Sequence, residues 1–196
     1  MNETKRPLQE EQKSVWEKMP LLHFVWMLPL FGILLFLDLS PKQWAERVLK
    51  DADPIPLIRG VLEFQYLENA GAAFGMMQRA QGFFVISAIA VLIIITSVLF
   101  NMPGGKRHLP LRVNVVVIAA GALGNLIDRL RFQYVRDFIY FKLINFPIFN
   151  VADICVTCGA IVLMILLLWF YKDKDLEFLS SSKRRETPQP GKKKKK

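Results

Sequence analysis

Histidine and cysteine are scarce in this sequence, with two residues of each among its 196. His23 lies in the first apolar run and His108 in a later polar loop, so they are too few and badly placed for a zinc site or a Ser-His pair. A Gly-x-Ser-x-Gly nucleophile elbow and a glycine-rich phosphate loop are also missing. These absences leave the carboxylates as the best-placed titratable groups.

The two cysteines, Cys155 and Cys158, form a Cys-x-x-Cys pair inside a run of Ile, Val and Leu. In a βαβ context this spacing would suggest a redox pair. Within an apolar helix it favours two small, polarisable side chains on one packing face, which is the interpretation we adopt.

Charged residues are almost absent from three long apolar runs. The runs 21–39 and 148–171 hold one aspartate each, and 82–100 holds no charge. A shorter run, 113–130, ends in an Asp-Arg pair. About 20 apolar residues cross 30 Å of hydrocarbon as a helix. We therefore predict one membrane domain, residues 20–171, with four transmembrane helices.

The net charge of +9 could suggest a nucleic-acid partner, but the distribution of Lys and Arg argues against it. Segment 1–19, loop 101–112 and tail 172–196 hold 17 of the 26 basic residues. By the positive-inside rule, these three segments are cytoplasmic. We expect a cytoplasmic N-terminal segment, no nucleic acid, and a disordered basic tail attracted weakly to the anionic leaflet.

One outer segment shows a strand-like alternation. Leu62, Phe64 and Tyr66 alternate with polar residues, which is typical of a half-buried strand. Gly71 and Gly75 then indicate a turn. We predict a small β-element over about 55–79, on the membrane surface between the first two helices.

Polar residues gather near the outer ends of the third and fourth helices. Gly121, Asn125 and Asp128 are spaced i, i+4 and i+7 and share one helix face, with Arg129 next in sequence. Gly121 favours close helix packing. Asp128 and Arg129 could form an interfacial ion pair, or Asn125 and Arg129 could frame a polar site; the spacing alone leaves both open.

Two aspartates are expected at this same outer end. Asp153 shares a helix face with Asn150, although an acid inside a bilayer costs about 2.5–3.5 kcal/mol. Asp137 precedes it by 16 residues, in an aromatic-rich loop. Two carboxylates in one site share a proton and can activate water while polarising a carbonyl. A proton relay or a structural hydrogen bond remains an alternative.

These residues stand in motifs that resemble those of a known family. The strings, in order, are LDLSPKQW, LENAGAAFGM, GALGNLIDRL, VRDFI and FNVAD. They resemble the motifs of lipoprotein signal peptidase (signal peptidase II), a bacterial membrane aspartic peptidase, across residues 21–171. Five such strings in the family's order on four spans form a specific signal.

The resemblance implies an all-α membrane fold of four transmembrane helices with a small periplasmic β-cradle between helices 1 and 2. It implies an aspartic-type endopeptidase that cleaves prolipoproteins just before the diacylglyceryl-modified cysteine, with water as nucleophile and no metal or other cofactor. The partners are lipid-modified prolipoproteins and membrane phospholipid. The protein is expected to be a monomer in the bacterial cytoplasmic (inner) membrane, with both termini cytoplasmic and the active site near the periplasmic face.

The resemblance also assigns roles to the site residues. Asp137 and Asp153 match the catalytic pair. The residues that match substrate-binding or dyad-orienting positions are Asn69, Gly71, Asn125, Arg129 and Asn150, and the supporting positions are Asp38, Lys42, Gly121, Asp128 and Ala152.

Three features depart from the family pattern: Gly75 where many relatives have Ser, Arg136 where an apolar residue is commoner, and the long basic tail. Arg136 would lower the pKa of Asp137 if its side chain pointed inward. Two functions of other classes stay open on the residues alone. The first is a proton-coupled carrier or channel with the aspartates as a relay, and the second is a scaffold without turnover.

Overall fold

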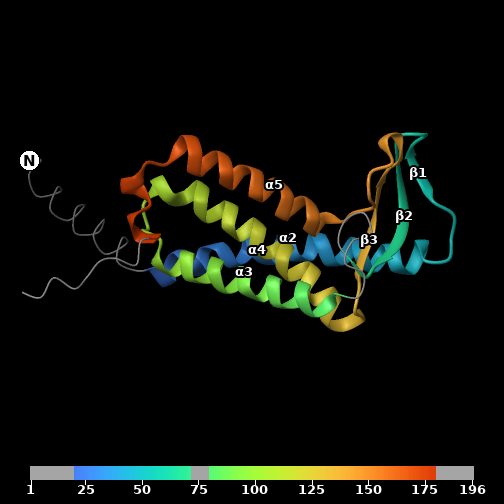
Figure 1. The fold of residues 1–196 in the computed structure, drawn as a ribbon, viewed down its shortest axis with the longest axis horizontal. Helices are drawn as coiled ribbons and strands as arrows, with labels where there is room; N and C mark the ends of the chain where they lie inside the picture. The colour runs from blue at the N-terminus through green and yellow to red at the C-terminus, as the bar shows by residue number, and fades with distance from the viewer. Residues whose placement is uncertain (1–19, 72–79, 180–196) are drawn as a thin grey trace, which may run out of the picture.

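The computed structural model describes residues 20–71 and 80–179. Its long helices are α2 (Pro20–Leu49), α3 (Gln81–Asn101), α4 (Leu109–Phe132) and α5 (Val151–Ile165), and α5 continues as the π-helical segment η4 (Leu166–Phe170). Within these described residues, four helices are long and apolar enough to cross a membrane, and they run along one elongated bundle (Figure 1). The predicted four-helix membrane fold is confirmed.

Helix α4 is the central helix of the bundle because each of the other three makes its most extensive helix contact with it. Its most apolar window is 61% buried, whereas the corresponding windows of the other helices are between 6% and 22% buried. Small residues permit this position: a Cβ on Gly121 would lie 2.6 Å from the Ala152 carbonyl oxygen, and one on Gly124 would collide with the Asp38 carboxylate. Close helix approach at glycine is the usual packing in membranes.

A three-stranded antiparallel sheet covers one end of the bundle (Figure 1). Its strands, in the order β1-β2-β3, are Ile55–Ile58, Leu62–Asn69 and Val135–Phe141. The prediction placed the β-element wholly between the first two helices, so it missed β3, which follows α4. Residues 135–138 are all buried, and a strand covered on both faces has no polar–apolar alternation to reveal it. Predicted turn residues 72–79, Gly75 among them, lie outside the described residues.

The first helix is longer than the predicted span of 21–39. It continues through Pro41 to Leu49, and the added turns pack against the sheet. Ala45 and Leu49 form a buried cluster with Phe138 of β3, and the Trp44 ring meets the Phe64 ring of β2 edge-on at 5.3 Å. Proline removes one helical hydrogen bond, but packed neighbours offset that loss here.

The tail prediction is wrong for residues 172–179. Short 3-10 turns, η5 (Asp173–Asp175) and η6 (Glu177–Leu179), fold back onto the bundle. Leu176 and Phe178 pack against the apolar core, and this burial offsets the entropy of ordering the segment. Residues 1–19 and 180–196, which hold the rest of the predicted terminal segments, lie outside the described residues.

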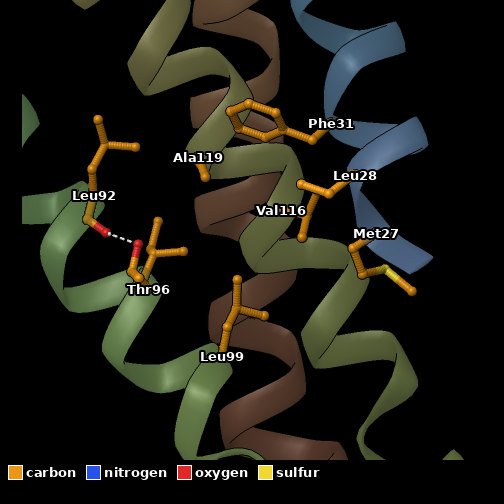
Figure 2. A pocket seen from close by; sticks show the side chains of 9 residues that line it. Met27, Leu28, Phe31, Leu92, Thr96, Leu99, Val116 and Ala119 are labelled. Carbon is orange, nitrogen blue, oxygen red and sulfur yellow. Dashed lines mark hydrogen bonds between the residues drawn. The ribbon is translucent and has the colours of Figure 1, made fainter. Parts of the chain in front are cut away.

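An apolar cavity of about 140 Å³ lies between α2, α3 and α4. Figure 2 shows Phe31, Leu99 and Val116 among its lining side chains, with the Thr96 hydroxyl bonded to the Leu92 carbonyl oxygen of its own helix. Helix α5 contributes no residue to this cavity. None of the candidate site residues lines it.

Candidate active site

The first turn of α5 orients Asp153. Asn150 is the N-cap residue: its side-chain oxygen accepts a hydrogen bond from the Asp153 N–H at 3.0 Å, and the Asn150 N–H donates to Asp153 Oδ2 at 3.1 Å. This capping box satisfies two backbone donors that a helix start otherwise leaves unpaired. It also leaves Asp153 Oδ1 free for a partner on another helix.

Asp137 approaches from the sheet, where it pairs with Leu67 of β2. Its side chain is 1% exposed and accepts two amide hydrogen bonds: Asn150 Nδ2 donates to Oδ1 at 2.6 Å and Asn69 Nδ2 donates to Oδ2 at 2.9 Å. Asn69 is itself fixed because its Oδ1 accepts the Gly71 N–H at 3.0 Å. Asn150 therefore contacts both aspartates.

Asn125 connects the two aspartates, Asp137 and Asp153 (the dyad), to the bundle. Its Nδ2 donates to Asp153 Oδ1 at 2.8 Å. Its Oδ1 accepts from Lys42 Nζ at 2.9 Å and from Asn150 Nδ2 at 3.2 Å. Since an ammonium group can only donate, Lys42 dictates which end of the Asn125 amide faces Asp153.

Lys42 is fully buried between two carboxylates. Its Nζ lies 2.8 Å from Asp38 Oδ2 and 3.4 Å from Asp128 Oδ2. Asp38 Oδ1 also accepts the Ala152 N–H at 2.7 Å, which joins α2 to the first turn of α5. A buried charge survives only when paired and hydrogen-bonded, and this cluster meets that condition.

Asp128 and Arg129 do not form the ion pair that their adjacency suggested. Asp128 Oδ1 lies instead 2.6 Å from Arg136 Nη2, and Arg136 Nη1 lies 2.8 Å from Glu46 Oε2. The Arg129 guanidinium lies over the Phe84 ring at 4.8 Å, and its buried Nε–H has no hydrogen-bond partner among the described residues.

The environment of Asp137 favours its neutral form. Its pKa is raised from 3.8 to about 7, chiefly by burial and also by the charge of Asp153, against the opposing effects of the Asn69 and Asn150 hydrogen bonds and the Lys42 charge. The Arg136 guanidinium pairs with Asp128 and Glu46, and it is not among the groups that lower the pKa of Asp137. Asp137 can therefore hold a proton near neutral pH.

The structure brings together the candidate residues that lie in its described part. Gly121 and Ala152 supply the close contact between α4 and α5, and the other ten supply polar groups. Glu46 was missed, although it continues the i, i+4 series of Asp38 and Lys42. That signal becomes readable once the first helix is known to extend past residue 39. Of the two cysteines, Cys155 is buried as predicted, but Cys158 is exposed; both are free thiols.

Such a pair can act on a carbonyl group by accepting a proton from water at one carboxylate and donating one from the other. Among residues 20–71 and 80–179, no group of three or more His, Cys, Asp or Glu side chains is arranged to hold a metal ion.

Comparison with known proteins agrees with the motifs. A family model described as "Signal peptidase (SPase) II" matches residues 30–169. Lipoprotein signal peptidases of Clostridium tetani and Clostridioides difficile are each 38% identical over 138 residues, which covers 68% and 70% of this chain and 86% and 91% of those proteins. The one from Clostridium novyi is 39% identical over 142 residues, or 71% of this chain and 93% of that protein.

The fold is shared with two solved structures of bacterial membrane enzymes. One, at 2.3 Å resolution, has a TM-score of 0.65 and 30% identity, covering 81% of this chain and 92% of that one. The other, at 1.9 Å resolution, has a TM-score of 0.64 and 31% identity, covering 74% and 93%.

Proposed function

This chain belongs to the signal peptidase II family, and from that premise we propose that it is an aspartic endopeptidase with Asp137 and Asp153 as its catalytic pair. It removes the signal peptide of a lipid-modified prolipoprotein by hydrolysis just before the diacylglyceryl cysteine. The observation that carries the proposal is the side chain of Asn150, which bonds to Asp137 and also caps the helix turn that holds Asp153.

The two aspartates differ in environment, and this difference assigns their roles. Asp137 is buried and its pKa is raised to about 7, so it carries the shared proton at neutral pH. This leaves Asp153 the role of the base. Pairs of titratable groups whose environments separate their roles in this way are the usual acid–base arrangement of peptidases.

The reaction then proceeds in two steps. Water gives a proton to Asp153 as its oxygen attacks the carbonyl carbon, while Asp137 gives its proton to the carbonyl oxygen, leaving a tetrahedral diol. The carbon–nitrogen bond then breaks as the departing nitrogen takes the proton from Asp153 and a diol hydroxyl returns its proton to Asp137. The pair ends as it began.

Three further side chains assist the aspartates: two fix their orientation and one is suited to binding the substrate. Asn125 and Asn69 each donate one amide bond to an aspartate, so both carboxylates keep a fixed rotation. Arg129 has spare donors in a partly buried guanidinium, which suits binding of a substrate carbonyl oxygen. Fixed donors of this kind lower the barrier because they need no rearrangement during the reaction.

The enzyme lies in the bacterial cytoplasmic membrane with both termini in the cytoplasm and the sheet end outside. The basic residues of segments 1–19, 101–112 and 172–196 support this orientation. The sheet and the start of α5 share one end of the bundle (Figure 1). Asp137 is in β3 and Asp153 is in the first turn of α5, so a lipid-modified peptide can enter sideways while its acyl chains stay in hydrocarbon. We propose that the enzyme acts as a monomer.

The test is processing of a purified diacylglyceryl-modified prolipoprotein, followed by gel shift. Asp137→Asn and Asp153→Asn should each lower the rate at least about 10²- to 10⁴-fold, the usual contribution of a positioned acid or base. Asp53→Asn, at an exposed acid before β1, is the matched control and should retain activity. Normal processing by either dyad variant would refute the assignment and leave a proton relay as the explanation of the pair.

A further inference from the structure

Arg136 directly precedes Asp137 on β3, yet its contacts lie in a different buried group. Side chains alternate along a strand, so that of Arg136 points to the other face of β3. Its Nη2 donates to Asp128 Oδ1 at 2.6 Å, and its backbone N–H donates to Asp128 Oδ2 at 3.1 Å. One residue therefore binds both oxygens of a fully buried carboxylate near the end of α4.

Asp128 also faces the Lys42 ammonium, but at a longer distance. Lys42 Nζ lies 3.4 Å from Asp128 Oδ2, whereas it donates to Asp38 Oδ2 at 2.8 Å and to Asn125 Oδ1 at 2.9 Å. An ammonium has three N–H donors and no acceptor, so its position is set by which acceptors compete for it. Because Arg136 already binds Asp128, two of the Lys42 donors stay with Asp38 and Asn125.

The buried charges of this group balance only when Arg136 is present. Asp38 and Asp128 supply two negative charges, and Lys42 and Arg136 supply two positive ones. Glu46 binds the other end of the Arg136 guanidinium, but its side chain is 29% exposed, so water screens its charge. Without Arg136, one buried ammonium would face two buried carboxylates. Lys42 would then shift toward Asp128, because attraction grows as opposite charges approach and an unpaired buried charge is costly.

A shift of Lys42 would release the amide that orients the base. Lys42 fixes the oxygen of the Asn125 side chain, and this directs Asn125 Nδ2 to Asp153 Oδ1 at 2.8 Å. We infer that Arg136 is a positioning residue of the reaction, an inference that rests on the proposed function. Its guanidinium neutralises Asp128, so Lys42 stays bonded to Asn125. Asn125 then keeps the Asp153 carboxylate in one rotation.

The test measures kcat and KM of the purified full chain with a diacylglyceryl-modified prolipoprotein. Arg136→Met should lower kcat about 10- to 100-fold, the usual cost of a small misplacement of a reacting group. KM should change little, because the network fixes the base and not the substrate. Arg136→Lys keeps a charge beside Asp128 and should recover most of the rate. Lys142→Met is the control: it removes an equal charge from an ion pair with Glu63, 3.1 Å away at the other end of the sheet, and should process normally.

A double variant separates positioning from a general loss of packing. In Arg136→Met/Asp128→Asn no unpaired carboxylate attracts Lys42, so this protein should be faster than Arg136→Met. A double variant as slow as the single one, or slower, would overturn the inference. A normal kcat in Arg136→Met, or an effect on KM alone, would also overturn it. If Arg136→Met does not fold, Arg136→Gln takes its place in both comparisons with the same expected outcomes, because glutamine lacks the charge.

Asp137→Asn distinguishes this inference from the proposed function. It removes the proposed acid itself, so it should stop processing whether or not Arg136 is present. Normal processing by Asp137→Asn would refute the proposed function. Normal processing by Arg136→Met, with Asp137→Asn inactive, would refute the positioning role alone.

Discussion

Lys42 of α2 is fully buried, and it fixes the position of neighbouring groups in the candidate active site. Its ammonium neutralises Asp38 and Asp128 and holds the Asn125 amide in the orientation that lets Nδ2 donate to Asp153. One positive charge therefore stabilises two helix contacts and the geometry of the Asp153 carboxylate. Because both acids would lose a partner together, this residue is the most sensitive point of the buried network.

Lys42→Met should lower the free energy of unfolding by about 3–5 kcal/mol, the usual cost of leaving buried charges unpaired. The measurement is thermal unfolding in detergent. Lys50→Met is the matched control, since Lys50 pairs with Glu68 at 2.7 Å but both side chains are exposed. Lys50→Met should lower stability far less, because water screens an exposed ion pair. Similar losses at the two positions would contradict the role of the buried lysine.

Asp137 makes stability depend on pH. The folded state keeps its proton up to about pH 7, whereas the unfolded chain releases it near pH 4. The folded state therefore binds more protons in this window, so the free energy of unfolding falls as pH rises, by up to about 1.4 kcal/mol per unit.

Asp137→Asn should remove most of this decline, which can be measured by thermal unfolding at pH 5 and pH 8. The wild type should lose more stability than the variant between these values. A parallel decline in the two proteins would show that Asp137 ionises in the folded state much as it does in the unfolded one.

At the scale of elements, the distance between α4 and α5 sets the geometry of the dyad. Asn125 of α4 bonds to Asp153 of α5, and Gly121, one turn away, keeps the two helices in contact. An added Cβ at residue 121 would lie 2.6 Å from a backbone oxygen, which cannot rotate away as a flexible side chain could.

Gly121→Ala should therefore separate the helices, lower stability by about 1–3 kcal/mol, and slow prolipoprotein processing. Gly82→Ala is the control, because a Cβ at Gly82 on α3 meets nothing within 4 Å. Both effects are measured on purified protein, by unfolding and by gel shift. An active, stable Gly121→Ala protein would show that the contact has more room than the structure gives it.

The four long helices could be predicted from the sequence, whereas the sheet could be predicted only in part. Apolar length alone marks α3, and the alternation of β2 is visible. Strand β3 has no alternation, and the last turns of α2 follow a proline in a polar sequence. Both are stabilised by tertiary contacts, such as Phe138 against Ala45, which no local pattern encodes.

Within the site, helical spacing indicated Asn125 with Asp128 and Asn150 with Asp153. Helical spacing could not predict partners on different elements, such as Arg136 with Asp128 or Lys42 with Asn125. The family motifs named most of these residues without saying what they touch. Lys42 and Asn125 are 83 positions apart and Arg136 and Asp128 are 8 apart across two elements, so both contacts depend on how the elements pack in the folded chain.

At the scale of the whole molecule, the orientation proposed here predicts which loops face out. In a variant without Cys155 and Cys158, Arg59→Cys should react with a membrane-impermeant thiol reagent added to cells, because the turn between β1 and β2 stands at the sheet end. Lys106→Cys, at the other end of the bundle, should react only after permeabilisation. The reverse pattern would invert the topology.

The capping of α5 has a consequence for biosynthesis. Asp38, Lys42, Asn69, Asn125 and Asp137 all precede Asp153 in the chain, yet their shared network closes only when the first turn of the last helix docks between β3 and α4. A nascent chain that has inserted three helices thus carries Asp38 without its bond from the Ala152 N–H and Asp137 without its bond from the Asn150 amide. The polypeptide gains its peptidase geometry in one late step, so a chain truncated before α5 yields no partial enzyme.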